Sequence, residues 1–379
     1  MWSSTPSVAS AGGVVKVLLA MSGGVDSSVA GALLLEEGHD VVGVTMKLWG
    51  GDSDTGCCSV SDVDDARRVA QQLGIDHLVF NFGDDFDRHV VEPYVRDHAA
   101  GVTPNPCIEC NRHVKFDRLL RRADQLGFDA VATGHHARIG RTADGRLTLE
   151  RGADAAKDQS YVVHMLDQGA LARTLFPVGS IDKSEVRRIA AERGLRTASK
   201  PDSQDVCFIT STGGRDTFLG DRIEFRPARV VDADGEQLGT VDAVEMVTIG
   251  QRRGIGLPGG GPKRYVVDVD VDGATVTVGD EQALLDDGLS VVDVVWTDAP
   301  VAGEVLVQAS AHGATLPATL TVGPTASATG DTVAVAWRTP QRRIAPGQSV
   351  VFYDPTDTRV LGGGIAVRAT TVRLGPPTA

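Results

Sequence analysis

The chain has 379 residues, a length that predicts two or three domains rather than one. Hydrophobic residues make up 42% of it, and no window approaches eighteen uninterrupted apolar residues, so we expect real cores and no membrane span. The formal net charge is −13, which, taken as a whole, argues against a nucleic-acid partner.

The first predicted element follows residues 1–13, which are small and polar and lack the pattern of a signal peptide. We therefore expect a disordered tail and a cytoplasmic protein. Residues 14–20 are rich in Val and Leu, which is typical of a buried parallel strand, and a helix is predicted from Ser27 to Gly38. The turn between them, residues 22–28, is SGGVDSS. A strand, a glycine turn and a helix N-terminus together predict a phosphate or pyrophosphate site.

Strands and helices then alternate over the next hundred residues. The sequence predicts strands over 41–48, 77–81 and 130–133 and helices over 61–73, 85–100 and 115–126. This alternation predicts an α/β fold with a doubly wound parallel sheet covered on both faces. Ligands of such sheets bind at the carboxyl ends of the strands, where the 22–28 turn, Met46 and residues 133–136 fall.

The second half of the chain has a different texture. A hairpin over 138–151 leaves the sheet, a helix opens near 157–161, another covers 184–193, and 200–210 is a loop that leads into a short apolar run. Beyond Gly220, short Val- and Thr-rich runs with frequent Asp-Gly and Gly-Pro turns predict β-structure. The expected division is a tail (1–13), a catalytic domain (14–219), a small β-rich central domain (220–285) and a C-terminal β-barrel (286–379).

Charge is unevenly distributed along the chain. Residues 266–336 hold eleven acidic residues and no Lys or Arg, which leaves −2 for the remainder. Basic residues cluster elsewhere, over 112–122, 187–200, 252–264 and 338–343. A local basic face can bind a phosphate backbone whatever the total charge. Solvated helix faces explain any single cluster equally well.

Five cysteines in a chain of this length do not form a disulfide framework, so they are free, catalytic or metal-binding. They are Cys57, Cys58, Cys107, Cys110 and Cys207. Cys107 and Cys110 lie in TPNPCIECN, whose two prolines predict a loop ahead of the 115–126 helix. Half of a zinc site and a redox pair are both open interpretations of CxxC. A third interpretation pairs Cys110 with Cys207 beside an ATP site.

The phosphate turn lacks the Gly-Lys-Ser/Thr of a Walker loop and the GxGxxG of a dinucleotide fold. It resembles the PP-loop of ATP pyrophosphatases, and the resemblance extends along nearly the whole chain. Eight motifs resemble those of bacterial tRNA-specific 2-thiouridylases: SGGVDSS, TPNPCIECN with Lys115-Phe116, TGHHAR (133–138), KDQSY (157–161), DSQDVCFI (202–209), GQRRGIG (250–256), PGQSVVFY (346–353) and LGGGI (361–365).

The resemblance implies a tRNA-uridine 2-sulfurtransferase. ATP, with Mg²⁺ near Asp26, activates the C2 oxygen of the wobble uridine at tRNA position 34 as an adenylate. A persulfide on Cys207 delivers sulfur to C2, and Cys110 acts as the nucleophile and ends in a disulfide with Cys207. Thiolate exchange suits this transfer. The implied partners are the tRNAs for Lys, Glu and Gln and a persulfide-donating protein, which is a cysteine desulfurase or a relay.

The same resemblance implies three further groups of contacts. The ATP site comprises Ala20, Met21, Ser22, Gly23, Gly24, Val25, Asp26, Ser27, Met46 and Gly134. The target base meets Asn105, Pro106 and Cys107. The tRNA meets His135, Lys157, Asp158, Gln159 and Gln348.

The chain departs from the family pattern at two places. Many members carry Asp at the position of Cys107, and a neutral thiol is a poorer base than that carboxylate. The change also creates a set of three thiols, Cys107, Cys110 and Cys207, which suggests an iron–sulfur cluster as a minority hypothesis. At Ser310-Ala311-His312 the family usually offers Arg-Tyr to tRNA, so contact there is expected to be weaker or relocated.

Two other functions compete with sulfur transfer. A PP-loop ligase or synthetase would also adenylate its substrate but would attack it with an amine, which leaves the loop cysteines and the barrel without a purpose. A non-catalytic tRNA-binding protein would not need an intact SGGVDSS together with Cys110 and Cys207.

Overall fold

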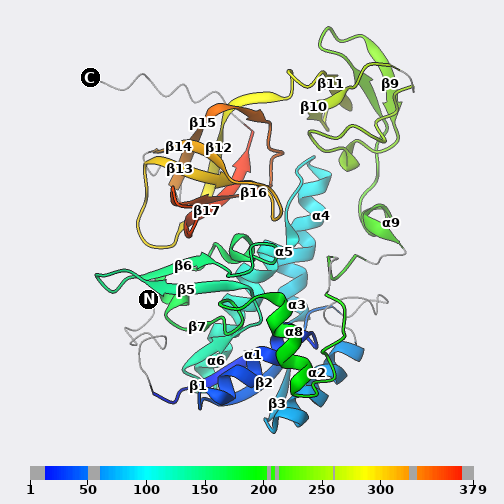
Figure 1. Ribbon diagram of the computed structural model, residues 1–379. Coiled ribbons are helices and arrows are strands. Elements are labelled where there is room, and N and C mark those ends of the chain that lie inside the picture. The colour runs from blue at the N-terminus through cyan, green and yellow to red at the C-terminus, as the bar shows by residue number, and fades with distance from the viewer. Residues whose placement is uncertain are drawn as a thin grey trace.

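The computed structural model describes residues 13–49, 60–202, 206–209, 213–258, 261–323 and 331–368. Three bodies are apparent in it (Figure 1): a mixed α/β body that contains the N-terminal half, a small β body and a β-barrel. Within the described part of the chain, no helix is long and apolar enough to cross a membrane.

The first body is built on a five-stranded parallel sheet with strand order β3-β2-β1-β4-β7. Its strands are β1 (Lys16–Ala20), β2 (Asp40–Lys47), β3 (His77–Asn81), β4 (Ala130–Ala132) and β7 (Thr174–Leu175). Alternate residues of β1 enter different cores: Val17 and Leu19 join one cluster, whereas Leu18 joins the other. The predicted doubly wound sheet is therefore confirmed.

Helices cover both faces of this sheet. One face carries α1 (Val25–Glu36), α2 (Val60–Leu73) and α8 (Lys183–Glu192). The other carries the continuous helical run of α3 (Gly83–Phe86), η2 (Asp87–Val91) and α4 (Glu92–Ala99), and the run of α5 (Pro106–Glu109), η3 (Cys110–Arg118) and α6 (Leu119–Gln125). Shorter helices are η4 (Ser160–Val163), α7 (Gln168–Leu171) and α9 (Gly214–Gly220).

The prediction that both motif thiols lie on a loop is wrong. The helix begins at Pro106, so Cys107 and Cys110 are helical. Proline is tolerated at the first helical position, where its missing N–H has no intrahelical partner, and the side chain of Asn105 caps the helix by accepting from Cys107 N at 3.1 Å. The helix expected to open near residue 157 begins at Ser160 as a single 3₁₀ turn.

The central body holds a four-stranded sheet with strand order β10-β11-β8-β9. Its elements are β8 (Ala228–Val231), β9 (Gln237–Val241), η5 (Val244–Met246), β10 (Tyr265–Asp270) and β11 (Thr275–Gly279). Its core consists of small aliphatic residues, mainly valines such as Val230, Val266 and Val276, which are fully buried.

The third body is a closed barrel of six strands, in which β12 pairs with both β15 and β17. The strands are β12 (Leu285–Trp296), β13 (Gly303–Gln308), β14 (Leu316–Val322), β15 (Asp331–Arg342), β16 (Ser349–Tyr353) and β17 (Arg359–Val367). Closure removes the exposed sheet edges that would otherwise invite pairing with another chain.

Several contacts among the described residues hold the bodies together. The hairpin of β5 (Ala137–Arg141) and β6 (Leu147–Arg151) leaves the parallel sheet and pairs with β17 of the barrel, which its own sequence did not indicate. Helix α4 rises between the barrel and the central body (Figure 1), and Thr103 just beyond it hydrogen-bonds to Pro346 O and to the Thr248 hydroxyl.

Candidate active site

The SGGVDSS turn lies where β1 ends and α1 begins. Gly23 has a φ of +71°, and a Cβ there would lie 2.4 Å from Asp62 O, so only glycine fits. The Ser27 hydroxyl accepts from Ser22 N at 3.3 Å and donates to Gly24 O at 3.2 Å. The turn thus presents its backbone and the N-terminus of a 12-residue helix to the carboxyl edge of the sheet, which is the geometry of an anion site.

Gly134, just after β4, packs directly on the same helix terminus. A Cβ on Gly134 would lie 2.6 Å from Ser27 N and 2.8 Å from the carbonyl carbon of Asp26. Met46 lies one residue before the end of β2, at the same edge of the sheet. Ala20 ends β1, and Met21 and Val25 are buried on either side of the turn. The residues proposed for the ATP site therefore come together at one edge.

Asp26 is held by two cationic or polar partners that the sequence did not indicate. Lys183 Nζ lies 2.6 Å from both carboxylate oxygens, and His136 Nε2 donates to Oδ1 at 3.1 Å. Burial opposes ionisation of Asp26, but these hydrogen bonds and the Lys183 charge outweigh it and lower its pKa. Asp26 is thus an anion held at the mouth of the phosphate turn.

A second carboxylate joins the same cations. Asp202 lies 2.8 Å from Lys157 Nζ, 3.0 Å from Lys183 Nζ and 2.8 Å from a guanidinium nitrogen of Arg187. Burial opposes ionisation here too, but the hydrogen bonds from Lys157 and Lys183 prevail and lower the pKa of Asp202 to about 2. Three cations therefore meet beside the phosphate turn. Asp202 also opens the segment that leads to Cys207.

Of the two motif cysteines, Cys107 is exposed on the first turn of α5, whereas Cys110 is 5% exposed at the start of η3. Cys110 belongs to the larger hydrophobic core, and Cys207, which is half-buried, packs against that same core. Phe208 anchors the Cys207 segment among aromatic rings, with Tyr94 and Phe86 at 5.4 and 5.6 Å between centroids. The cysteines at 110 and 207 are thus brought to one apolar cluster.

The thiols of Cys107, Cys110 and Cys207 are potential metal ligands. Among residues 13–49, 60–202 and the other described ranges, no three His, Cys, Asp or Glu side chains are close enough to hold a metal ion. Cys107, Cys110 and Cys207 therefore do not form a cluster-binding set in this arrangement. Cys57 and Cys58 lie outside the described residues.

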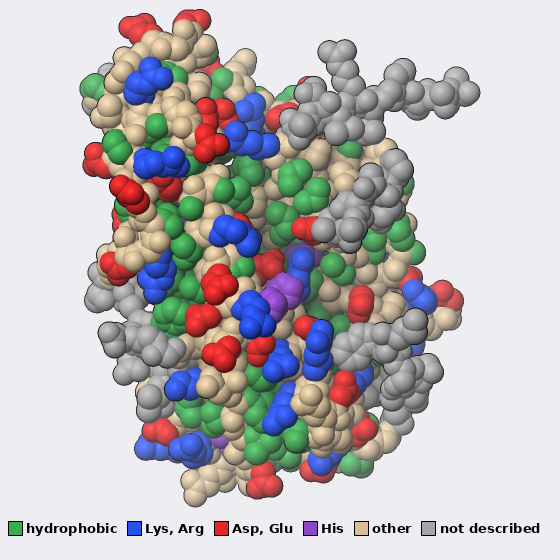
Figure 2. All heavy atoms as spheres, turned by 180° about the vertical axis from the view of Figure 1, so that it is seen from behind, with side chains coloured by type: hydrophobic (Ala, Val, Ile, Leu, Met, Phe, Trp, Pro, Cys, Tyr) green, Lys and Arg blue, Asp and Glu red, His purple; other side chains and the backbone are tan. Residues whose placement is uncertain are grey.

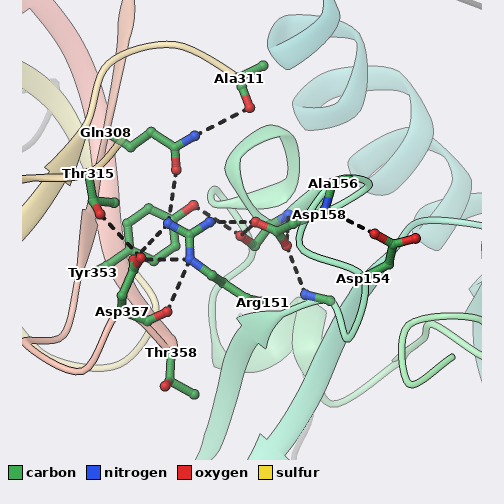
Figure 3. A network of polar contacts seen from close by, with 12 residues as sticks. Arg151, Asp154, Ala156, Asp158, Gln308, Ala311, Thr315, Tyr353, Asp357 and Thr358 are labelled. Carbon is green, nitrogen blue, oxygen red and sulfur yellow. Dashed lines mark hydrogen bonds and ion pairs between the residues drawn. The ribbon is translucent and has the colours of Figure 1, made fainter. Parts of the chain in front are cut away.

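The KDQ segment proposed to contact tRNA makes several internal contacts (Figure 3). The Asp158 side chain is 7% exposed and accepts hydrogen bonds from Arg151 Nη1 at 2.6 Å, Gly152 N at 2.8 Å and the Ser160 hydroxyl at 2.8 Å. Gln159 exchanges two hydrogen bonds with the backbone of His136. In this segment the Lys157 side chain is 37% exposed, whereas that of Asp158 is 7% exposed.

Arg151 itself joins the first body to the barrel. Its guanidinium contacts Asp357 at 2.8 Å and Gln308 at 3.1 Å and lies 3.9 Å from the centroid of the Tyr353 ring (Figure 3). All three partners belong to the barrel or its loops, so one side chain at the end of β6 connects the KDQ segment to the C-terminal body.

The other two residues proposed to contact tRNA, His135 and Gln348, are also held in place by neighbouring residues. His135 packs against Phe116 and Phe176, which also contact each other, and burial lowers its pKa to about 3, so the ring is neutral at pH 7. The Gln348 amide donates to Thr103 O at 2.6 Å, which braces the loop ahead of Asn105 from the barrel side. Gln348 and Asn105 are thereby brought to one region.

Sequence reasoning placed His136 at the ligand edge of the sheet without giving it a role, and it did not identify Lys183, Arg151 or Asp202 as site residues. One signal for Lys183 was present: it is the first residue of α8, where a cation opposes the helix dipole. A lysine tolerated there indicates a nearby anion. The partners of Arg151 are far away in the sequence, and no local pattern indicates them.

Comparison with known proteins places this architecture in a family. The chain matches models described as the tRNA methyl transferase HUP domain (residues 15–211), the tRNA methyl transferase PRC-barrel domain (216–280) and the aminomethyltransferase beta-barrel domain (286–366). It is 46% identical to the tRNA-specific 2-thiouridylase MnmA of Heliobacterium modesticaldum, over 94% of both chains.

Two further relatives of the same name match at similar levels. The protein of Chloroflexus aurantiacus is 46% identical over 94% of this chain and 99% of its own. That of Acidothermus cellulolyticus is 46% identical over 95% of this chain and all of its own length. With its parallel sheet, central sheet and barrel in the same order, the chain belongs to the tRNA-specific 2-thiouridylase family.

Proposed function

We propose that this enzyme converts the C2 carbonyl of the wobble uridine in tRNA into a thiocarbonyl, consuming ATP and releasing AMP and pyrophosphate. The observation that carries the proposal is the placement of two elements in one body: a PP-loop with its cations, and Cys110 and Cys207 packed in one core.

The first step is activation of the base. The uridine O2 attacks the α-phosphorus of ATP, a P–O bond to the β-phosphate breaks, and pyrophosphate leaves. The backbone of residues 22–28 and the N-terminus of α1 bind the phosphates, while Lys183 and Lys157 stabilise the charge that develops on the leaving group. Met46 and Gly134 border the nucleoside end of the site.

The second step is sulfur delivery. The terminal sulfur of a Cys207 persulfide bonds to C2, and the Cys110 thiolate attacks the Cys207 sulfur. The S–S bond of the persulfide breaks, its electrons remain on the sulfur bound to C2, and AMP leaves with O2. Cys110 and Cys207 finish as a disulfide, which an external thiol must reduce before the next turnover. Asn105, Pro106 and Cys107 form the rim that would meet the base; of these, Cys107 is exposed, Asn105 is half-buried and Pro106 is buried.

Magnesium fits beside the phosphate turn. The Asp26 carboxylate is 29% exposed, and Mg²⁺ prefers carboxylate oxygen together with substrate phosphates. When bound, the ion would neutralise phosphate charge. An iron–sulfur cluster on Cys107, Cys110 and Cys207 does not fit the described arrangement, and no step is assigned to it. Iron analysis of anaerobically purified protein tests that alternative.

The proposed reaction requires two macromolecular partners, a tRNA and a protein that donates a persulfide. Basic and acidic side chains are interspersed over the face drawn in Figure 2, so the chain does not present a single-sign field to RNA there. Binding of tRNAs for Lys, Glu and Gln therefore depends on particular contacts of the rim and the barrel. Cys207 is half-buried, and a protein that donates a persulfide must reach it.

The test is thiolation of unmodified tRNA with Mg-ATP and a sulfide or persulfide donor, read as 2-thiouridine by mass spectrometry. Cys110→Ser and Cys207→Ser should each abolish product while leaving tRNA affinity nearly unchanged, because neither thiol carries a phosphate contact. Product from both variants would overturn the assigned sulfur chemistry. AMP formation with ammonia as acceptor, and no thiolation by the native chain, would favour the ligase alternative.

A further inference from the structure

A cavity of about 720 Å³ lies where the three bodies meet, away from the phosphate turn. Its floor is the first body, from the end of α4 to η3, and includes Asn105 and Arg112. Residues 346, 347 and 349 form one wall, and the central body supplies Asp270 and Asp272 to the opposite wall. The cavity is therefore continuous with the rim proposed to hold the target base.

Arg112 is the exceptional side chain of this floor. Its Nε and Nη2 atoms are buried, and neither has a hydrogen-bond partner among the described residues. The carboxylate next to it, Glu109, makes its ion pair with His113 at 3.2 Å. A buried donor of a charged group without an acceptor costs free energy, so such a group in a cavity wall indicates a ligand acceptor.

Several other members of the basic clusters form ion pairs with carboxylates. Arg118 pairs with Asp85 and Arg121 with Asp117, and in the second cluster Lys200 pairs with Asp62. Arg112 differs from these residues because its guanidinium nitrogens retain unused donors. At this cavity, Arg112 is therefore the member of the 112–122 cluster whose guanidinium has buried donors without partners among the described residues.

A second donor lies in the same wall. Ser349 is 1% exposed, lines the cavity, and its hydroxyl has no hydrogen-bond partner among the described residues. Ser349 comes from β16, directly after Gln348, whereas Arg112 comes from η3. Two residues that carry unsatisfied donors, from different bodies, thus line one space, and such donors can bind an oxyanion once they turn toward it.

The opposite wall limits the size of that anion. Asp270, Asp272 and Asp293 line the cavity from the central body and the barrel, and their charges would repel a run of phosphates. A cavity with this acidic wall therefore fits one phosphate with its neighbouring sugar better than a polyanion. Because Nε and Nη2 are covered, the guanidinium must turn toward the cavity to bind it.

We propose that Arg112, with Ser349, binds one phosphodiester of the tRNA chain next to the target nucleotide. This inference rests on the proposed function, since it needs tRNA as the substrate. A tRNA phosphodiester is favoured over free inorganic phosphate because the cavity adjoins Asn105 and the Gln348 segment, which the proposed base and tRNA contacts occupy.

The test compares native enzyme with Arg112→Gln, Arg112→Lys and the control Arg96→Gln. Arg96 lines the same cavity, but its guanidinium is paired with Asp97 at 2.9 Å and its side chain is 72% exposed. Affinity for unmodified tRNA is measured across a range of salt concentrations. Arg112→Gln should weaken tRNA binding about tenfold and reduce the slope of log K against log salt by about one. Arg112→Lys should lose less affinity and keep the slope.

The outcomes separate the possible roles of Arg112. Unchanged tRNA affinity and slope in Arg112→Gln, with native-like thermal unfolding, would overturn the proposal. The same result with lower stability would assign the guanidinium to the buried His164, whose Nε2 also has no partner among the described residues, and would overturn it equally. Inorganic phosphate that stabilises native enzyme but not Arg112→Gln, with equal tRNA affinity in both, would identify a free-phosphate site instead. Failure of the proposed function is distinct, because native enzyme would then bind tRNA without forming 2-thiouridine.

Discussion

Two polar regions of this molecule differ in whether their charged and polar groups have partners within the protein. Beside the phosphate turn, Asp26, Asp202, Lys157 and Lys183 are paired with one another at 2.6 to 3.0 Å. At the three-body cavity, Arg112 and Ser349 retain donors without partners. In the first region the charges are paired within the protein, so a ligand must replace existing ion pairs when it binds. In the second region the donors are unsatisfied, so a ligand would supply the missing acceptors.

This difference has a consequence for affinity. ATP phosphates compete with Asp26 and Asp202 for the same ammonium groups, so part of the binding free energy is offset by the ion pairs that are lost. An anion at Arg112 faces no such competitor within hydrogen-bonding distance among the described residues. Substitutions in the first region should therefore change catalysis with ATP, and substitutions in the second should change RNA binding.

The largest effect is expected at Lys183. Lys183→Gln removes the cation that touches both Asp26 oxygens and Asp202, so the leaving pyrophosphate loses one charge-assisted donor. Adenylation should fall on the order of 10²–10³-fold, the size measured when one preorganised donor is removed. The measurement is pyrophosphate release under single turnover with saturating tRNA, and tRNA affinity should stay native.

Asp26→Ala provides the second arm of this experiment. If Lys183 acts only by neutralising Asp26, the double variant should recover activity relative to Lys183→Gln. If Lys183 binds phosphate, as proposed, the double variant should be at least as impaired as either single one. A native rate of pyrophosphate release in Lys183→Gln would place the phosphates elsewhere.

A smaller effect is expected at the connection between the first body and the barrel. Arg151 has two carboxylate partners, of which Asp158 is 7% exposed and Asp357 is 42% exposed. Asp158→Asn breaks a buried pair and should lower the free energy of unfolding by about 3 kcal/mol. Asp357→Asn, at a half-exposed pair, should cost about 1 kcal/mol or less.

Chemical denaturation with matched variants measures both changes. Glu304→Gln, on a barrel pair with Arg338 that is exposed on both sides, is the control and should be near neutral. Equal losses for Asp158→Asn and Asp357→Asn would show that Arg151 does not distinguish its buried partner from its exposed one.

The contrast between these regions also explains what could be predicted from sequence. The strand, turn and helix of residues 14–38 are contiguous, so their periodicity and small residues predict both the parallel sheet and the phosphate turn. Lys183 reaches Asp26 across 157 positions, and Arg151 reaches Asp357 across 206. Such pairs depend on how packed elements meet, which no local pattern encodes.

The CxxC segment shows how a local sequence rule can give a wrong prediction of secondary structure. Two prolines in TPNPCIECN predict a loop, yet Pro106 is the first residue of a helix because Asn105 caps it. The rule that proline ends helices holds for their interiors and not for their first turn. Asn is a preferred N-cap residue, so Asn105 is a signal in the sequence for a helix that starts at Pro106 and contains Cys107 and Cys110.

The smallest expected effect is an acid dependence of stability that originates at Asp202. Its pKa is about 2 in the folded chain, below the value near 3.9 of an unfolded Asp, because Lys157 and Lys183 donate to it despite its burial. A carboxyl with a lowered folded pKa stabilises the fold fully above about pH 4, and that stabilisation is lost as the pH falls from about 4 toward 2. Asp202→Asn should therefore differ most from native enzyme in free energy of unfolding at pH 6 and least near pH 2. Glu304→Gln controls for the loss of an exposed carboxylate, and a difference for Asp202→Asn that stays constant between pH 6 and pH 3 would mean that the three cations do not hold Asp202 in solution.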